Sequence, residues 1–597
     1  MAFYHPIFAS ANQPIFSPNK GSAILGMKLI PKHVICSGHN KIHFTIASKQ
    51  TIHISDNGIK GRDTLQIRHA KALKEVKREL VDMARQNEDQ GLFMVDSIQR
   101  LGIDHHFEEE IETILKRKNY LLLRVHSCQG NDYQELSKVA LQFRLLRQQG
   151  YYIHADIFDK FWDNEGKLKQ TFYDDIYGLI ALFEASQFSV EGEDYLHESG
   201  ELCRQYLNMW LSRFQDHPQV KAVAHSLRCP IHKSLPRFTP TIFQLQNYGM
   251  SNSLLELSKI DTEMVSSLHL KEIFAVSKWW KDLGLTKDLK FARDEPIKWY
   301  MWPMACLPDP RFSEERIELT KPLSLVYIID DIFDFSGSIH DLTLFTHAVK
   351  RWDLAAVEQL PDYMKACFKA LYDITNEFAV KTHLKHGWNP ISTLIKSWVR
   401  LCNAFLEEAK WFASGHVPKA EEYLKNGIVS TGAHVMLVHS FFLMGQGITE
   451  ETAILMDDFP SLVSSTATIL RLCDDVEGDK DVSGDGHDGS YLKCYMNDHP
   501  GVSIEKTREH VNKLISDAWK RLNQECLIDA NPLPSSFAKL CLNATRMVPL
   551  MYSYDTNSPS KLEEYVKSLL YGGAYMQSVP QDHTSNNLIG TTETKSG

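Results

Sequence analysis

The chain has 597 residues, of which 43% are hydrophobic and 23% are charged, a balance typical of globular rather than disordered proteins. Its formal net charge of −10 argues against a nucleic-acid partner, because nucleic-acid-binding surfaces are basic. No uncharged apolar run is long enough to span a bilayer, so we expect no membrane span. The 11 cysteines are scattered without a CxxC pair, which predicts reduced thiols.

The first 55 residues differ in composition from the rest of the chain. They contain no acidic residue, lysines and serines are spread through them, and the first arginine is Arg62. An acid-poor, basic, serine-containing leader is typical of an organelle transit peptide, and the lack of arginine favours a plastid over a mitochondrion. We predict a plastid transit peptide here, with a disordered tail of chance composition and a cytosolic location as the alternative.

Helical periodicity dominates the chain from about residue 65 onward. The stretches 69–86 and 510–527 place apolar residues three and four apart, whereas strict alternation is scarce. A gathering of prolines followed by Gly, Ser and Asn in 228–253 indicates a break between domains. The sequence therefore predicts an all-α fold with two helical domains. The predicted division is a leader over 1–55, an N-terminal domain over 56–245, a C-terminal domain over 246–580 and a disordered tail over 581–597.

Residues 328–337, which read IIDDIFDFSG, place three carboxylates in an apolar segment. Asp330 and Asp334 are four residues apart and lie on one face of a helix, with Asp331 beside them. A solvated acidic helix end is the common alternative, but the upstream run LSLVYII is too apolar for one. Carboxylates inside a helical bundle are most often metal ligands, and oxygen ligands without His or Cys suit Mg²⁺, with Mn²⁺ as the alternative. We predict such a site, in which the ion also contacts water and a substrate phosphate.

A second acidic cluster lies downstream, with seven acids in residues 474–488. The stretch 479–490 begins like a calcium-binding EF-hand loop, but Ser490 stands where the loop requires Glu, so we do not expect calcium sensing. Two acid-bearing helices that face each other in one bundle would hold Mg²⁺ around a diphosphate. Arg293 and Arg471 lie before the two clusters and would supply positive charge to the same diphosphate.

Aromatic side chains complete the chemistry that such a site needs. If a diphosphate leaves from carbon, a carbocation remains, and aromatic faces stabilise cations. The C-terminal domain offers several candidates, most of which are expected to be ordinary core residues: Trp299, Tyr300, Trp302, Tyr327, Phe333, Tyr552 and Tyr554.

In their order along the chain, these motifs resemble the plant terpene synthase family over nearly the whole length. They are the arginine-bearing segment FARDEPIKWYMW (291–302), the aspartate-rich VYIIDDIFD (326–334), the broken helix GIVSTGAHV (427–435), the second metal motif RLCDDVEGDKDV (471–482) and MYSYD (551–555). The segment LFEASQFSVEGEDYL (182–196) in the first domain is also similar to the family. A lone DDxxD motif would be a weak signal, whereas the ordered set is specific.

The resemblance implies an N-terminal α-barrel-like domain with a structural role and a C-terminal class I helical bundle that uses three Mg²⁺ ions. The roles carried over are metal binding by Asp330 and Asp334 with support from Asp331, metal binding by Asp474 at the head of the second motif, diphosphate binding by Arg293 and Arg471, and contact of Trp302 with the reacting cation. Asp330, Asp334 and Asp474 would thereby also bind the substrate.

Three departures from the family pattern bear on function. The arginine-bearing segment reads Arg-Asp-Glu where the family has Arg-Asp-Arg. Gly478 and Val482 occupy two ligand positions of the second metal motif. We hypothesise that Asp481, together with Glu477, replaces the missing ligands, because both share a helix face with Asp474. The chain has no Arg-Arg dipeptide, which many cyclising members carry.

Among the family, the chain most resembles the acyclic linalool and nerolidol synthases. This implies ionisation of geranyl diphosphate, or of farnesyl diphosphate, and capture of the allylic cation by water, which yields linalool or nerolidol plus diphosphate. The alternatives are a cyclising mono- or sesquiterpene synthase and a catalytically impaired protein that binds a prenyl diphosphate, which the degenerate second motif favours. We expect a monomer whose partner is this small-molecule substrate.

Overall fold

The computed structural model describes residues 57–125, 135–163, 168–235, 251–478, 490–528 and 531–552, together with residues 562 and 566. These residues form helices joined by turns, and within them the β-type pairing amounts to an isolated bridge between Trp162 and Leu168. The all-α prediction is therefore confirmed. The predicted leader, the division at residue 245 and the tail from 581 lie outside the described residues.

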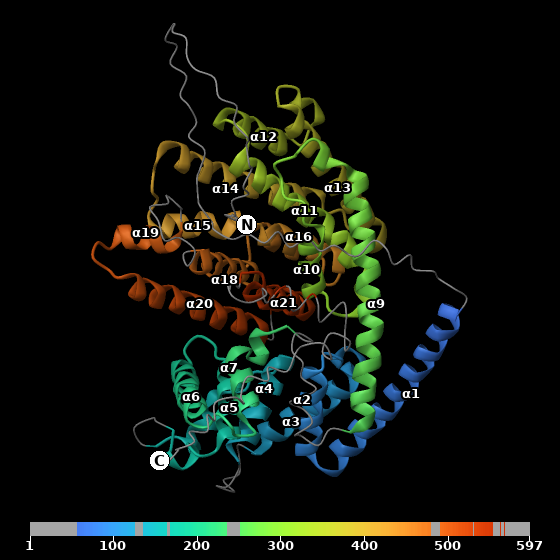
Figure 1. Ribbon diagram of the computed structural model, residues 1–597, viewed down its shortest axis with the longest axis vertical. Helices are drawn as coiled ribbons and strands as arrows, with labels where there is room; N and C mark the ends of the chain where they lie inside the picture. Colours follow the sequence, from blue (N-terminus) through green and yellow to red (C-terminus); the bar gives the residue numbers. More distant parts are fainter. Residues whose placement is uncertain are drawn as a thin grey trace, which may run out of the picture.

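The helices fall into two groups, each with its own apolar core (Figure 1). The first group is α1 (Asn57–Gln86), α2 (Glu88–Arg100), α3 (Glu108–Val125), α4 (Leu136–Gln149), α5 (Ile176–Ser186), α6 (Asp194–Arg213) and α7 (Val220–Arg228). The second group begins with α9 (Asn252–Leu283), α10 (Pro296–Cys306), α11 (Ser313–Phe335), α12 (Ile339–Arg351), α13 (Asp362–His386) and α14 (Ile391–Ser414). It continues with α15 (Ala420–Ser430), α16 (Ala433–Met444), α17 (Glu450–Asp457), α18 (Ser461–Gly478), α19 (Tyr491–Asp498), α20 (Ile504–Leu527) and α21 (Ser535–Met551).

Helix α9 belongs to both groups and runs along the side of the molecule from one to the other (Figure 1). Leu254 and Leu257, near its start, are buried in the first core, whereas Ile273 and Trp280, near its end, are buried in the second. Ser251 caps the start, because its side chain accepts a hydrogen bond from a free backbone N–H of the first turn. Gly284, at φ 75°, ends the helix in the left-handed conformation that glycine adopts without strain.

The second group surrounds a core in which helix α11 is central. Residues 322–333 of α11 are all buried, and α11 contacts α9, α10, α13, α14 and α16. The helix ends at Phe335, after which Gly337 at φ 123° turns the chain into α12. A capping box between Ser338 and Asp341 then begins α12. The aspartate-rich segment therefore lies in the last two turns of a buried helix.

One stretch, Ala420–Met444, is long and apolar enough to cross a membrane by length and composition. Of its most apolar window, 83% is buried inside the helical group, and the stretch comprises two helices, α15 and α16, which meet at Gly432. We therefore assign it to the core of the second helical group.

Candidate active site

The first acidic cluster lies at the end of helix α11. Asp330 and Asp331 are 1% and 2% exposed, and Asp334 is half-buried one turn later. The apolar residues around them draw this face of the helix into the core, so that the carboxylates are buried with it. A buried carboxylate requires a cationic partner or a metal ion, because its removal from water is otherwise costly.

Arg293 supplies that partner from the segment between α9 and α10. Its backbone N–H and its Nε each donate to Asp331 at 2.8 Å, and one terminal nitrogen donates to Asp330 Oδ2 at 2.8 Å. The same nitrogen also contacts Asp331 Oδ1. Asp331 thus binds both the main chain and the side chain of Arg293, whereas Asp330 holds a single nitrogen of the guanidinium.

An aromatic pair extends this arrangement into the core. The guanidinium carbon of Arg293 lies 5.3 Å from the centre of the Tyr327 ring, within the range of a cation–π contact. The Tyr327 hydroxyl in turn accepts a hydrogen bond of 2.8 Å from Nε1 of Trp302, which is fully buried on α10. Burial raises the pKa of Tyr327 far above neutral, so its hydroxyl stays protonated. Both aromatic residues are candidates from the sequence, whereas the hydrogen bond between them depends on how α10 packs against α11.

The second acidic cluster lies at the end of helix α18. Arg471 is 2% exposed and points toward the end of α15, where its Nε donates to the Gly427 carbonyl at 3.4 Å and a terminal nitrogen donates to Ser430 Oγ at 3.4 Å. A guanidinium is favourable at this place, because the carbonyl end of a helix carries partial negative charge. The other terminal nitrogen lies 3.6 Å from Asp474 and 3.3 Å from Asp475.

Asp475 is a well-bonded residue that sequence analysis missed. One oxygen accepts from the Tyr423 hydroxyl at 3.1 Å and from Arg471, and the other accepts from the backbone N–H of Tyr491 at 2.9 Å. These contacts tie α15, α18 and the start of α19 together. The four-residue spacing between Arg471 and Asp475 was the available sequence signal, since residues at that spacing pair on a helix.

Two glycines allow the broken helix to approach both acid-bearing helices. A Cβ atom at Gly427 would lie 3.2 Å from Cδ of Arg471 on α18, and a Cβ at Gly432 would lie 2.4 Å from Cγ1 of Val326 on α11. Gly432 also adopts φ 68°, a conformation that strains other residues. The break between α15 and α16, within the segment that the sequence predicts to be a broken helix, thus sits against α11 on one side and α18 on the other.

The charges of the two clusters act on each other. Burial raises the pKa of Asp330 to about 6, although Arg293 acts to lower it. Burial also raises the pKa of Asp474 to about 7; Arg471 opposes this rise, whereas Asp475 and the distant Asp330 add to it. Asp330 and Asp474, which are far apart in the sequence, therefore lie close enough in the fold for their charges to repel. Their arginines leave this repulsion only partly neutralised, so the donor set fits hard divalent cations.

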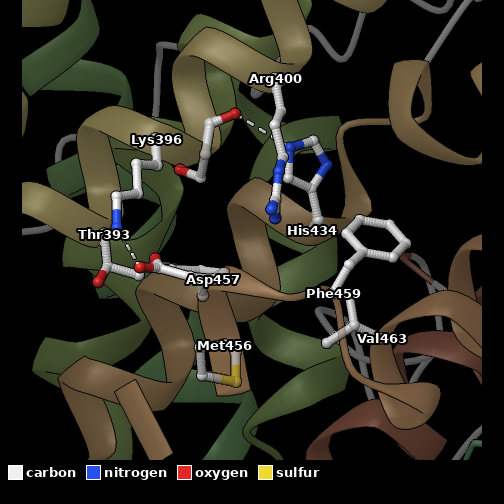
Figure 2. Close-up of a pocket in the computed structure, with 10 residues that line it drawn as sticks. Thr393, Lys396, Arg400, His434, Met456, Asp457, Phe459 and Val463 are labelled. Atoms are coloured by element: carbon white, nitrogen blue, oxygen red, sulfur yellow. Dashed lines mark hydrogen bonds and ion pairs between the residues drawn. The ribbon is translucent and has the colours of Figure 1, made fainter. Parts of the chain in front are cut away.

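A separate, shallow recess lies between α14, α16, α17 and the start of α18 (Figure 2). Lys396 and Asp457 form an ion pair across it, and the ring of His434 lies 5.5 Å from that of Phe459. Burial lowers the pKa of His434 to about 3, so its imidazole is neutral. None of the predicted site residues lines this recess, and we assign it no role in the chemistry.

The structure brings most of the predicted site residues together around the two acidic clusters. Arg293 contacts Asp330 and Asp331, with Asp334 on the next turn, whereas Arg471 contacts Asp474. Trp302 is joined to the first acidic cluster through Tyr327 and Arg293. Asp481, the proposed replacement ligand, lies outside the described residues, as does the stretch that resembles an EF-hand loop.

The chain belongs to the terpene synthase family. Residues 281–521 match the family model described as "Terpene synthase family, metal binding domain", and residues 43–227 match "Terpene synthase, N-terminal domain". The metal-binding domain contains both acidic clusters and implies a divalent metal cofactor.

Plant enzymes are among the similar proteins. A "Neryl diphosphate diphosphatase, chloroplastic" of Glycine max is 53% identical over 85% of this chain and 96% of its own length. An "(E)-nerolidol synthase" of Cannabis sativa is 48% identical over 81% of this chain and 88% of its own length. An "S-(+)-linalool synthase, chloroplastic" of Arabidopsis thaliana is 44% identical over 85% of this chain and 89% of its own length.

Solved structures of the same fold are also similar. Isoprene synthase from grey poplar, in complex with three Mg²⁺ ions and dimethylallyl-S-thiolodiphosphate, matches with a TM-score of 0.79 at 30% identity, over 85% of this chain and 97% of that one. A limonene synthase with 2-fluorolinalyl diphosphate matches with a TM-score of 0.78 at 31% identity, over 85% of this chain and 94% of that one.

Proposed function

We propose that the protein ionises geranyl diphosphate, with farnesyl diphosphate as the longer alternative, and captures the allylic cation with water. The carbon–oxygen bond to the diphosphate breaks, and a water oxygen bonds to the tertiary carbon and loses a proton. The products are linalool or nerolidol and diphosphate. The observation that carries this proposal is the pair of buried acidic clusters whose charges act on each other, each with its own arginine.

Asp330, Asp334 and Asp474 are the residues that would hold the metal in this proposal. Three Mg²⁺ ions are proposed because the isoprene synthase complex contains three. Bound there, Mg²⁺ would supply positive charge to the diphosphate as it leaves. Asp331 is the weakest candidate ligand of the first cluster, because both of its oxygens already bind Arg293. We assign it the role of positioning that arginine.

Arg293 would have to release Asp330 in order to bind a phosphate oxygen. It can do so while Asp331 still holds its backbone N–H and Nε, because a different nitrogen binds Asp330. Arg471 is more tightly held, by Gly427, Ser430 and Asp475, so its charge is fixed in place beside Asp474. Such preorganised charge stabilises a developing anion without a cost of reorganisation.

Trp302 is proposed to face the carbocation left behind. Its indole N–H is already bonded to Tyr327, which fixes the orientation of the ring and leaves the π-face as its remaining interaction surface. Through Tyr327 the same unit reaches Arg293, so the groups proposed to bind diphosphate and cation are linked at the end of α11.

Product analysis in ¹⁸O-labelled water tests this proposal. Protein that lacks residues 1–55 is incubated with Mg²⁺ and, separately, geranyl, neryl and farnesyl diphosphate, and the volatiles are identified by mass spectrometry. We expect tertiary alcohols with the label in the hydroxyl group, since water attacks carbon. A cyclic main product would replace the proposal with a cyclising synthase, and no product from any substrate would support the impaired protein.

A second candidate is hydrolysis to a primary alcohol, which the similarity to a neryl diphosphate diphosphatase favours. In the same experiment this activity yields nerol or geraniol. Label in the primary alcohol would indicate ionisation followed by attack of water at the terminal carbon. Unlabelled primary alcohol would indicate cleavage of the phosphorus–oxygen bond and would overturn the ionisation mechanism.

We also propose a plastid location, because two of the similar enzymes are named as chloroplastic and the leader has the composition of a transit peptide. Fusion of residues 1–55 to a fluorescent protein in leaf cells tests it. Fluorescence confined to the cytosol would contradict this location.

A further inference from the structure

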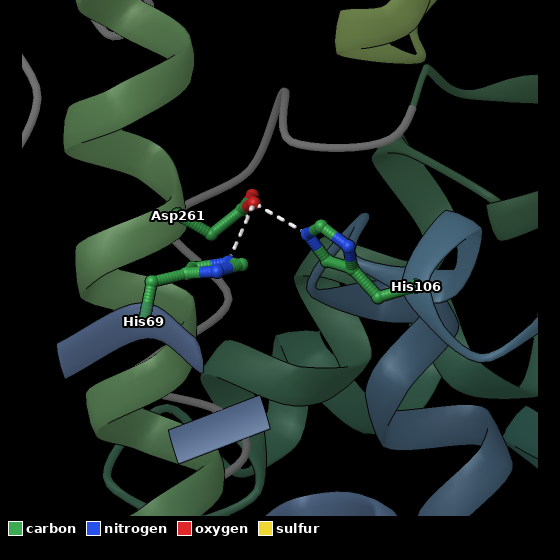
Figure 3. A group of neighbouring side chains, drawn as sticks. All are labelled: His69, His106 and Asp261. Carbon is green, nitrogen blue, oxygen red and sulfur yellow. Dashed lines mark hydrogen bonds and ion pairs between the residues drawn. The ribbon is translucent and has the colours of Figure 1, made fainter. Parts of the chain in front are cut away.

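Three side chains from separate parts of the chain converge beside the first half of helix α9 (Figure 3). They are His69 on α1, His106 at the end of the 3₁₀ turn Asp104–His106, and Asp261 on α9. Nε2 of His106 lies 2.8 Å from Asp261 Oδ1, and Nε2 of His69 lies 3.6 Å from the same oxygen. One potential ligand atom from each residue lies within 4.8 Å of the others. Both imidazoles point toward the carboxylate (Figure 3).

Within the cluster, one ring nitrogen of His69 has no hydrogen-bond partner. The side chain of Asp261 is 3% exposed, and the side chains of His69 and His106 are 12% and 21% exposed. A hydrogen bond joins His106 to Asp261. Nε2 of His69 is buried without a hydrogen-bond partner, although it faces the same carboxylate. Leaving such an atom unpaired costs about 1–3 kcal/mol, whereas a cation between the three groups would bind all of them.

The donor set selects the kind of cation. Two imidazole nitrogens and one carboxylate oxygen suit Zn²⁺ and related transition metals, whereas Mg²⁺ prefers oxygen ligands alone. Zn²⁺ binds such atoms at about 2.0–2.1 Å in tetrahedral geometry, which separates neighbouring ligand atoms by roughly 3.3 Å. The separations of 2.8 and 3.6 Å lie on either side of that value, so small side-chain movements would complete the site.

We propose that His69, His106 and Asp261 bind a single Zn²⁺ ion, with water in the fourth position. The ion joins α1 and the 3₁₀ turn to α9, and so links His106 to Asp261, which are 155 positions apart in the chain. Its role is structural, because these ligands come from the first helical group and the start of α9, whereas the acidic clusters lie on α11 and α18. The proposal is independent of the prenyl diphosphate chemistry.

Cobalt binding to the metal-stripped full chain, freed of any polyhistidine tag, tests the site. Mg²⁺ is kept in large excess so that the carboxylate sites are occupied by the hard ion. We expect one equivalent of Co²⁺ to produce the intense visible absorption of a tetrahedral site and Zn²⁺ to abolish it. His69→Gln and Asp261→Asn should each lose this absorption. His383→Gln, which alters an exposed histidine on α13, should retain it.

Calorimetry on the same proteins gives the second readout. Zn²⁺ in excess over its dissociation constant should raise the Tm of the wild type and of His383→Gln by at least about 2 °C, because a ligand that binds the folded state stabilises it. The rise should vanish in His69→Gln, which folds without the metal because His69 Nε2 makes no hydrogen bond. Absence of the cobalt absorption in the wild type, or its persistence in His69→Gln, would overturn the proposal.

Discussion

The two acidic clusters neutralise their buried charge in different ways. On α11, Asp330 and Asp331 pair with Arg293, which comes from another segment and whose side chain is 12% exposed. On α18, Asp474 and Asp475 pair with Arg471 of the same helix, whose side chain is 2% exposed and which also bonds to the end of α15. The first pairing can rearrange with little change to the helices, whereas the second is part of the packing. The first cluster therefore has the freedom to exchange partners, and the second sets a fixed charge opposite it.

The largest effect is expected from Asp330→Asn in the first cluster. The substitution removes a proposed metal ligand and its charge while preserving the shape of the side chain, so kcat/KM should fall by about 100-fold or more. Steady-state turnover of geranyl diphosphate with Mg²⁺ measures the loss. Asp362→Asn, at a fully exposed position on α13, is the matched control and should retain activity. An active Asp330→Asn enzyme would remove the first cluster from the proposed metal site.

Alanine substitutions of Asp474 and Asp475, two adjacent acids of the second cluster, should have different effects. Asp475→Ala deprives the Tyr423 hydroxyl, the Tyr491 backbone N–H and Arg471 of a buried acceptor, so the free energy of unfolding should fall by about 2–4 kcal/mol. Asp474→Ala should instead abolish turnover at little cost in stability, because the contact of Asp474 with Arg471 is a longer one of 3.6 Å.

Urea denaturation in the presence of a chelator, combined with turnover in Mg²⁺, distinguishes the two variants. If Asp474→Ala were the less stable and Asp475→Ala remained stable, the roles assigned to these neighbours would be reversed.

Helical periodicity was enough to predict the all-α fold, because apolar spacing directly reports which helix faces are buried. The DDxxD segment could also be predicted from the sequence, since Asp330 and Asp331 contrast with the apolar residues around them. The pairing of Asp331 with Arg293 could not be predicted, because it depends on how a loop folds back on α11. The cluster of His69 and Asp261 was missed for the same reason, since no local spacing links residues of different helices.

Gly432→Ala tests whether the broken helix sets the approach between the two acid-bearing helices. The added Cβ would meet Val326 at 2.4 Å and would also be strained at φ 68°, so the free energy of unfolding should fall by about 2–4 kcal/mol. Gly387→Ala is the matched control for strain alone, because Gly387 has φ 75° and open space around its Cβ position. It should lose about 1–2 kcal/mol.

Val326→Ala in the Gly432→Ala background should recover part of the difference, because it removes the methyl groups in the way. Denaturation curves of these variants and of Val326→Ala alone provide the measurement. Equal losses for Gly432→Ala and Gly387→Ala would show that the close approach to α11 has no energetic weight.

The smallest expected effect is a pH dependence that comes from the second cluster. The folded-state pKa of Asp474 is about 7, above its ordinary value of 3.8, so its ionised form destabilises the fold. Its protonation should therefore stabilise the metal-free protein as the pH falls from 8 to 6, by roughly 1 kcal/mol. Buried His439, whose pKa is lowered to about 4 by burial, acts in the opposite direction below its ordinary pKa.

The difference between wild type and Asp474→Asn isolates the contribution of Asp474, since both proteins share all other titrating groups. Denaturation at several pH values with a chelator present should show that this difference shrinks as the pH falls. A difference that does not change with pH would mean that Asp474 does not titrate between pH 6 and pH 8, which would contradict its raised pKa.

Helix α9, shared by the two apolar cores, makes the molecule one cooperative unit. Its 32 residues extend for about 48 Å, and its two ends contribute to different cores. Melting of the first helical group would fray α9 from Leu254 onward and loosen Trp280, which packs against Trp299 on α10. Heat should accordingly unfold both groups in a single calorimetric transition.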